Sequence, residues 1–345
     1  MKSLKVFTWI VLINIYFVII AGSVVRMSGS GMGCPDWPKC FGYLIPPTEQ
    51  SQIEWKENHE FEKGQIIIHK EALVLAKSDF TTAETYNENN WKAYTKHNYA
   101  VFNVYHTWTE YVNRLFGALL GFFALILIYF AVKNKKINNW FLWLSLIQLF
   151  LILFQAWLGK LTVDTNLNPY MITYHMLGVT VMVVVQLLLL KLVNKEINAK
   201  AKEGNNPGST LKSVAITGII LMIIQIVLGT QVRQQTDVLM DAGIERELVA
   251  QGFDYMFYIH RSFSFLLVFA IGFLFVKLRS IPRFIKPLNY LIVFTVLEII
   301  AGIVLFYIGM PAFAQPIHIL LSILIFAFFV EIYLRLLPQL QSKRD

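Results

Sequence analysis

The segment Phe257-Tyr258-Ile259-His260-Arg261 places a histidine and an arginine at the start of a long apolar run. A histidine beside a hydrocarbon-like segment is energetically costly, so it calls for a functional explanation. The segment Glu110-Tyr111-Val112-Asn113-Arg114 opens another apolar run in the same way, with Asn113 at the position of His260. Two more histidines, His175 and His318, fall in later apolar runs. This recurrence indicates two metal or cofactor sites, one in each half of the chain.

The composition is that of a membrane protein. Of the 345 residues, 56% are hydrophobic and 15% are charged, which excludes a disordered chain and is unusual for a soluble globule. Apolar windows of about 20 residues, long enough to cross a hydrocarbon layer of roughly 30 Å as helices, occur eight times. Their approximate ranges are 6–25, 112–132, 140–159, 172–193, 213–232, 258–277, 286–308 and 315–337.

The net charge of +8 is distributed in a way that predicts topology. Lysine and arginine gather at both ends of the chain and in every second loop, so the positive-inside rule places both termini in the cytoplasm. Nucleic-acid binding is not indicated, because no basic and aromatic stripe lies outside these flanks. The first window is too long for a signal peptide and lacks a cleavage site. We therefore expect a retained helix in a bacterial plasma membrane.

The two halves of the chain repeat one another. The segment Gly22-Ser23-Val24-Val25-Arg26 ends the first window, and Gly229-Thr230-Gln231-Val232-Arg233 ends the fifth. Three residues match three others at a constant offset of 143: Gln155 with Glu298, Gly159 with Gly302, and His175 with His318. Matches in register indicate duplication of a four-helix unit. We predict an all-α integral membrane protein, with eight transmembrane helices forming two repeated four-helix bundles.

The predicted halves are 1–194 and 213–345, joined on the cytoplasmic side by a polar, breaker-rich linker at 195–212. The first half carries a long extracytoplasmic loop after its first helix, the insert 27–108. We expect short helices within its stretch 48–98.

The four repeat-related positions, Asn113, His175, His260 and His318, all lie near the outer ends of their windows. Imidazoles from two facing helices are a common way to hold haem iron in a bundle. A single membrane histidine could equally be a packing residue, but the repeat favours ligands for His260 and His318. Zinc would require three or four ligands, whereas the pattern offers two in each half.

Four arginines stand beside these positions: Arg26, Arg114, Arg233 and Arg261. Guanidinium groups form paired hydrogen bonds with carboxylates, and haem propionates are one such partner. The alternative is that these side chains reach lipid headgroups at the interface. The residues alone leave both interpretations open.

Cys34 and Cys40, the two cysteines of the chain, lie in the first outer loop. The predicted location is an oxidising compartment, so a disulfide is expected. The spacing leaves open whether the bond is structural or exchanges electrons.

Two carboxylates are candidates for chemistry. Glu110 shares a helical face with His106 and Asn113, and it could act as an acid or base or be a solvated carboxylate at a helix start. Glu298 lies in the middle of a window, where an acid is costly. It could pair with a polar side chain or relay protons.

Together these motifs resemble the haem A synthase family. The residues that carry the resemblance are the run from Gly22 to Cys40, the segment Glu110–Arg114, and His175, His260-Arg261 and His318. The resemblance covers all eight windows. It implies an enzyme that oxidises the C8 methyl group of haem O to the formyl group of haem A for terminal oxidases. It further implies a haem b in the C-terminal half, substrate haem in the N-terminal half and a catalytic role for Glu110.

One departure from the family is Asn113, where a histidine is usual, because asparagine is a poor iron ligand. His106 lies two helical turns, roughly 10 Å, further out on nearly the same face. It would replace the ligand if the haem lies higher; otherwise His175 is the one strong ligand. A second departure is that the loop 233–257 has no cysteine pair.

The resemblance implies haem O and membrane lipid as partners, and it allows haem O synthase, oxidase assembly factors or a second copy of the chain. Two other functions compete with it. A di-haem b electron carrier, such as a quinol-linked cytochrome subunit, would need two saturated haem sites, which Asn113 disfavours. A transporter with a two-fold repeat would need a pair of Gly/Pro-broken helices, and we see none.

Overall fold

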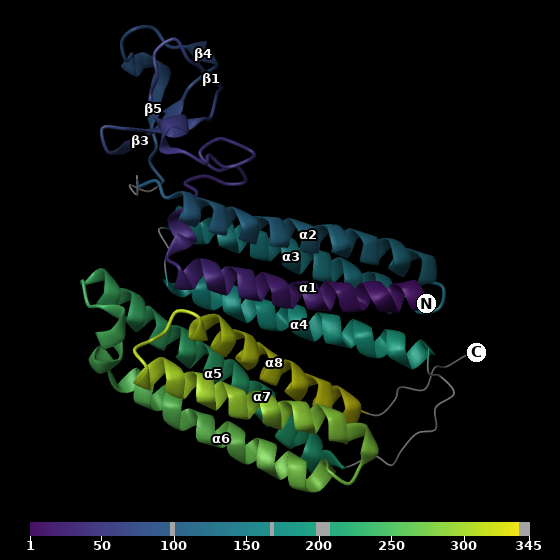
Figure 1. Cartoon of the computed structure of the whole chain (residues 1–345). Helices are drawn as coiled ribbons and strands as arrows, with labels where there is room; N and C mark the ends of the chain where they lie inside the picture. Colours follow the sequence, from purple (N-terminus) through teal and green to yellow (C-terminus); the bar gives the residue numbers. More distant parts are fainter. Residues whose placement is uncertain (97–100, 166–168, 198–207, 338–345) are drawn as a thin grey trace. The chain divides into compact units, whose positions relative to one another are not determined.

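The computed structural model describes residues 1–96, 101–165, 169–197 and 208–337. Long α-helices dominate these residues (Figure 1). Eight of them are long and apolar enough to cross a membrane, which confirms the eight predicted windows. Their bounds are α1 Lys2–Met27, α2 Val104–Asn134, α3 Trp140–Asp164, α4 Pro169–Ile197, α5 Ser209–Asp241, α6 Tyr255–Leu278, α7 Pro282–Tyr307 and α8 Ala314–Leu336.

Two helices extend well beyond their apolar windows. Helix α2 begins at Val104, where the side chain of Asn103 accepts the N–H of Tyr105 at 3.0 Å. Helix α5 continues to Asp241, and an ion pair of 2.9 Å one turn apart, between Arg233 and Asp237, supports the extension. Hydropathy detects only the part of a helix that meets hydrocarbon, so the polar turns lay outside the predicted windows.

The chain divides into two compact units. The first contains Met1–Ile20, Leu119–Gln155 and Thr173–Asp345, and the second contains Ala21–Ala118 and Ala156–Ile172. The insert and the helix ends adjoining it therefore form a unit of their own. The halves 1–194 and 213–345 are a division by sequence repeat, and they remain a prediction. Residues 198–207 of the predicted linker lie outside the described part of the chain.

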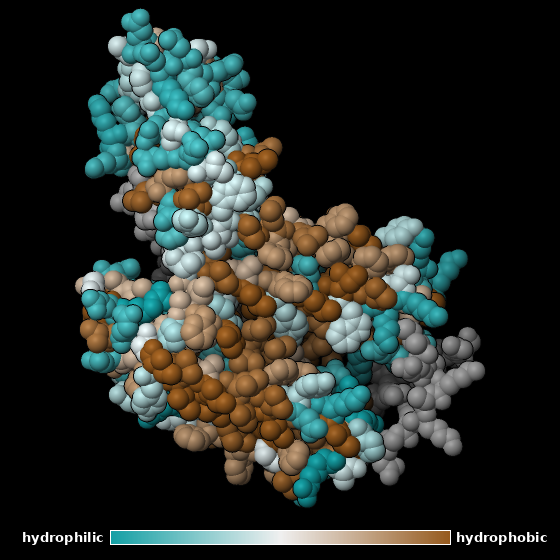
Figure 2. All heavy atoms as spheres, in the orientation of Figure 1, coloured by the Kyte–Doolittle hydropathy of each residue, from teal (hydrophilic) through white to brown (hydrophobic). Residues whose placement is uncertain are grey.

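In the first unit, apolar side chains from all eight helices form one buried cluster. Helix α5 packs against α6 and α8, and α7 packs against α8 (Figure 1). One buried polar contact joins two of these helices: the Gln186 amide of α4 donates to the Thr8 carbonyl of α1 at 2.7 Å. Hydrophobic residues cover much of the visible face of the helices (Figure 2), as expected of a surface in contact with lipid.

The insert contains β-structure, which corrects the expectation of short helices over 48–98. Strand β1 (Glu60–Phe61) pairs with β4 (Phe80–Thr81), and β2 (Ile66–His69), β3 (Ala72–Ala76) and β5 (Trp91–Ala93) form an antiparallel sheet in the order β2-β3-β5. The helical structure described in this stretch is two 3-10 turns, Gln50–Ile53 and Glu88–Asn90. Hydrophilic residues cover most of the visible surface of the upper part of the insert (Figure 2).

The β2–β3 hairpin explains why the strands were not recognised. His69 pairs with Ala72, so the turn has only two residues, Lys70 and Glu71, with φ of 50° and 62°. Such a turn normally has Asn-Gly or Asp-Gly. The turn lacks that signal, and the strands have only two to five residues. The alternation of apolar and polar residues is therefore too short to predict a strand.

Candidate haem-binding site and disulfide loop

The rings of His260 on α6 and His318 on α8 face each other in the first unit. Their centroids lie 6.4 Å apart and their planes are inclined at 71°. Nitrogen atoms bound on opposite sides of one metal ion lie about 4 Å apart, because each metal–histidine bond is about 2 Å long. The ring centres lie further out than the nitrogens. The observed separation therefore suits one metal ion between the two rings.

Each of these rings is buried along one edge. The Nδ1 atoms of His260 and His318 are both inaccessible to solvent, yet 25% of the His318 side chain remains accessible, and His260 is half-buried. The His260 Nδ1 atom has no hydrogen-bond partner among the described residues. Because part of each ring stays accessible while its Nδ1 edge is buried, the pair of rings fits a site that is completed by a ligand such as haem.

Glycines on the neighbouring helices allow close approach to these rings. A Cβ atom on Gly229 of α5 would lie 3.2 Å from His260 Cε1, and one on Gly302 of α7 would lie 3.5 Å from His318 Cε1. In the second unit, a Cβ atom on Gly22 of α1 would lie 3.7 Å from Asn113 Oδ1. Asn113 is thus packed against a glycine as His260 is.

Two glutamines, each four residues before one of the repeated glycines, hold histidine backbones. Gln225 donates from Nε2 to the carbonyl of His260 at 3.0 Å, and Gln155 donates to the carbonyl of His175 at 3.2 Å. We did not single out Gln225 from the sequence. Its spacing to Gly229 equals that of Gln155 to Gly159, and this match could have identified it.

Glu298 occupies the corresponding position on α7 but makes a different contact. Its Oε2 atom lies 3.2 Å from the Nδ1 atom of His318. This is ion-pair distance, although the N–H direction is not aligned for a hydrogen bond in this rotamer. Of the two roles considered from sequence, pairing with a polar side chain describes the observed contact.

The first-half residues lie in different units. His175 is on α4 in the first unit, half-buried, and its Nδ1 atom has no hydrogen-bond partner among the described residues. His106, Glu110 and Asn113 are all on α2 in the second unit. His106 is half-buried in the first turn of that helix. The joint action of His106 and His175 remains a proposal.

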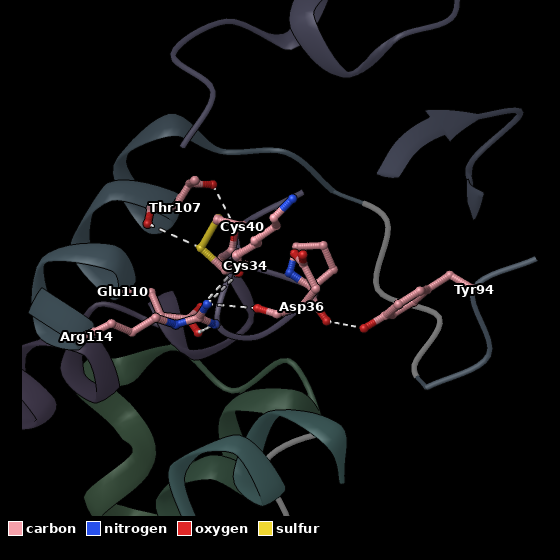
Figure 3. A network of polar contacts seen from close by, with 10 residues as sticks. Cys34, Asp36, Cys40, Tyr94, Thr107, Glu110 and Arg114 are labelled. Atoms are coloured by element: carbon pink, nitrogen blue, oxygen red, sulfur yellow. Dashed lines mark hydrogen bonds and ion pairs between the residues drawn. A yellow bond between two sulfur atoms is a disulfide. The ribbon is translucent and has the colours of Figure 1, made fainter. Parts of the chain in front are cut away.

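Glu110 belongs to a polar network at the start of α2 (Figure 3). Its Oε1 atom pairs with Arg114 Nη2 at 2.6 Å, and its Oε2 atom accepts the N–H of Cys34 at 2.9 Å. Arg114 Nη1 donates to the carbonyls of Asp36 and Lys39, both at 2.8 Å. Glu110 is only 4% exposed, so it is a buried structural anchor and not a solvated carboxylate.

The loop that these two side chains hold is closed by a disulfide. Cys34 and Cys40 are bonded, as predicted, with an S–S distance of 2.02 Å. The Thr107 hydroxyl donates to the Gly33 carbonyl at 2.8 Å. A Cβ atom on Gly33 would lie 2.5 Å from the backbone carbonyl of His106. The loop therefore sits directly on the first turns of α2, and only glycine fits at position 33.

Asp36 and Tyr94 extend the network further within the insert (Figure 3). Burial raises the pKa of the Asp36 carboxyl, although its hydrogen bond from the Gly42 N–H at 3.0 Å and the Arg114 charge oppose the shift. The Tyr94 hydroxyl donates to the Pro35 carbonyl. Burial, with the Asp36 charge nearby, raises the pKa of Tyr94. The hydroxyl is therefore a permanent donor at neutral pH.

The four candidate arginines have different surroundings. Arg26 lies in the last turn of α1, and Arg233 pairs with Asp237. The Arg261 guanidinium lies 5.3 Å from the Tyr258 ring centroid. Arg114 is held by Glu110 and the loop carbonyls of Asp36 and Lys39. Contact of any of them with propionates remains a proposal.

Comparison with known proteins identifies the family of the chain. The sequence model of the COX15-CtaA family, described as "Cytochrome oxidase assembly protein", matches residues 5–330. The chain belongs to this family. A "Heme A synthase" of Shewanella oneidensis is 27% identical over 64% of this chain and 55% of its own length. A "Heme A synthase" of a Wolbachia from Brugia malayi is 24% identical over 94% of this chain and 95% of its own length.

A shorter match has a higher identity: a "Heme A synthase" of Bacillus licheniformis is 42% identical over 82 residues, 23% of this chain and 25% of its own length. In this COX15-CtaA member, the facing imidazoles can hold a metalloporphyrin. Glu110 and Arg114 can fix a disulfide-closed loop at the end of a membrane-spanning helix.

Proposed function

We propose that this protein is a haem A synthase, which oxidises the C8 methyl group of haem O to a formyl group. The observation that carries the proposal is the family match over residues 5–330. Proteins named haem A synthase that align over nearly the whole chain support it. The eight membrane-spanning helices suit an enzyme whose substrate and product are membrane-soluble porphyrins.

In the proposed enzyme, His260 and His318 hold a haem b. The 6.4 Å separation of their rings and their accessible edges support this assignment. A haem with both axial positions filled by histidine transfers electrons without binding oxygen. Arg233 and Arg261 are the cations of this half that would meet its propionates.

Haem O, the substrate, is assigned to the first half, with His175 as its strong ligand. Asn113 lies beside Gly22 in this half as His260 lies beside Gly229 in the other. Asparagine offers only a weakly ligating amide oxygen. We assign the second ligand to His106 and the acid–base role to Glu110. Arg26 and Arg114 are the first-half cations for the propionates of haem O. The Arg114 pairing keeps Glu110 ready to accept and return a proton at the end of α2.

The proposed location is a bacterial plasma membrane, with both termini in the cytoplasm and the insert outside. The distribution of basic residues supports this orientation. Haem O synthase, which makes the substrate, and oxidase assembly factors, which use the product, are the proposed protein partners. A homo-oligomer is compatible with the apolar helix surfaces.

The test is to produce the chain together with a haem O synthase in bacteria that lack haem A, and to separate the extracted haems by chromatography. The proposal predicts haem A together with haem O and haem b. Haem b alone would indicate an electron carrier, and a preparation without haem would indicate a transporter. Either result would overturn the proposed function.

A further inference from the structure

We infer that Glu298 is a positioning residue for His318, and that its carboxylate lowers the reduction potential of the haem that His260 and His318 hold. The inference rests on the proposed haem b site, and it assigns a role to a buried acid that the reaction itself does not use. It starts from a pattern that recurs on four helices of the chain.

The helices α1, α3, α5 and α7 each carry a glycine at matching places of the repeat. The glycines of α1, α5 and α7 lie beside Asn113, His260 and His318, respectively. The four glycines are Gly22 on α1, Gly159 on α3, Gly229 on α5 and Gly302 on α7. The residue four positions earlier shares the same helical face. It is Val18, Gln155, Gln225 and Glu298, respectively. Three of these four residues have polar side chains of similar size, but only one is an acid.

The chemistry of the side chain decides which atom it contacts. A glutamine amide can donate, and both Gln155 and Gln225 donate to the backbone carbonyl of their histidine. A carboxylate only accepts, so Glu298 cannot make that bond. Its Oε2 atom instead approaches the ring of His318, 3.2 Å from Nδ1. The exchange of an amide for an acid thus moves the contact from the backbone to the imidazole.

Helix α7 fixes the His318 ring at two points. Glu298 lies at Nδ1, and Gly302, one turn later, lies against Cε1. A carboxylate this close to Nδ1 favours, by its charge, the tautomer with the proton on Nδ1, which leaves Nε2 free to bind a metal. His260 differs, because among the described residues no carboxylate is found at ion-pair distance from its ring, whereas His318 has Glu298 at 3.2 Å. The two proposed ligands of one iron are therefore unequal.

The electrostatic consequence follows from the charge that iron gains on oxidation. A negative group at the far side of a ligating imidazole makes the nitrogen a stronger donor and stabilises ferric over ferrous iron. The interaction is strong because the surroundings have a low dielectric constant. An acid within a membrane segment is costly, whereas glutamine, present at the two matching positions, would be less so. The proposed effect on the reduction potential of the haem gives a physical reason for an acid at position 298.

The experiment compares Glu298→Gln with the unchanged protein, both purified in detergent with their haem. Glutamine keeps an acceptor oxygen for Nδ1 and removes the charge. We expect full b-type haem content and a midpoint potential shifted to a more positive value in a redox titration. Glu298→Asp, which keeps the charge, should stay closer to the original potential than Glu298→Gln. An unchanged potential in Glu298→Gln would overturn the inference.

Gln155→Glu is the matched control, because it places an acid at the equivalent position of the other half. It should leave the potential of the b-type haem unchanged. An equal and opposite shift in this control would show a long-range charge effect and overturn the local role of Glu298. Absence of b-type haem from the unchanged protein would instead refute the proposed function. The two failures are therefore distinguishable.

Discussion

His260 and His318 are the residues on which the proposed haem b site depends most directly. Replacing either with alanine removes one imidazole from a pair whose rings lie 6.4 Å apart. We expect loss of most of the b-type signal in the reduced-minus-oxidised spectrum of each variant. His59→Ala, an exposed imidazole in the insert, is the matched control and should keep the signal. A full-intensity signal in both site variants would refute the assignment.

His106 and Glu110 are predicted to act on the substrate. His106→Ala should abolish both haem O retention and its conversion, while the haem b spectrum persists. Glu110→Ala should let haem O bind but stall its oxidation. Because Glu110 also anchors Cys34 and Arg114, Glu110→Gln is the necessary companion, since it removes the charge but keeps an acceptor oxygen for one of these two donors. Removing one partner of a buried ion pair costs about 3–5 kcal/mol.

Conversion assays on these variants separate the two accounts of the first half. If His106→Ala makes haem A at the normal rate, His175 is the one strong ligand and the other iron position is open. If Glu110→Gln is as active as the unchanged protein, Glu110 serves only to hold the loop. The sequence placed both residues on one helical face, but it could not show the hydrogen bond to Cys34, which joins positions far apart in the chain.

At the scale of elements, the disulfide loop is fastened to α2 by side chains from Thr107, Glu110 and Arg114. We expect that alkylation without reductant labels neither Cys34 nor Cys40. Labelling after denaturation with reductant is the control, and quantitative labelling of both without reductant would contradict the structure. Replacing both cysteines by serine should cost about 2 kcal/mol, the closure entropy of a short loop.

The elements were predictable where burial in lipid dictates them. Eight apolar windows became eight helices, because a spanning segment must satisfy its own backbone hydrogen bonds. The β-strands of the insert were not predictable. They are short, and the Lys70-Glu71 turn adopts positive φ without a glycine. The pairing of the cysteines was predictable from their compartment, but the role of Arg114 in holding their loop was not.

At the scale of the whole molecule, the basic loops predict that both termini are cytoplasmic. Reporter domains fused before Lys2 and in the segment 198–207 should be active on the cytoplasmic side. A reporter placed at the Lys70-Glu71 turn should be active outside. Activity of the terminal fusion and the Lys70-Glu71 fusion on the same side would contradict the predicted topology.

The sequence repeat located His260 and His318, and each of these rings lies beside a matching glycine, Gly229 or Gly302. The repeat could not reveal what differs between the halves at the level of single contacts. Gln155 and Glu298 occupy matching positions, yet one meets a backbone carbonyl and the other an imidazole. Such differences depend on whether a side chain can donate, and they become visible only when its partner is known.

The attachment of the insert gives the chain a modular character. The Phe41 carbonyl accepts the N–H of Ile66 at 3.1 Å, and the Tyr94 hydroxyl bonds to the Pro35 carbonyl. These two contacts tie the segments around Ile66 and Tyr94 to the disulfide loop. Surface segments of the insert can therefore be shortened or enlarged at little entropic cost. The exposed Lys70-Glu71 turn suits the grafting of an epitope or a tag.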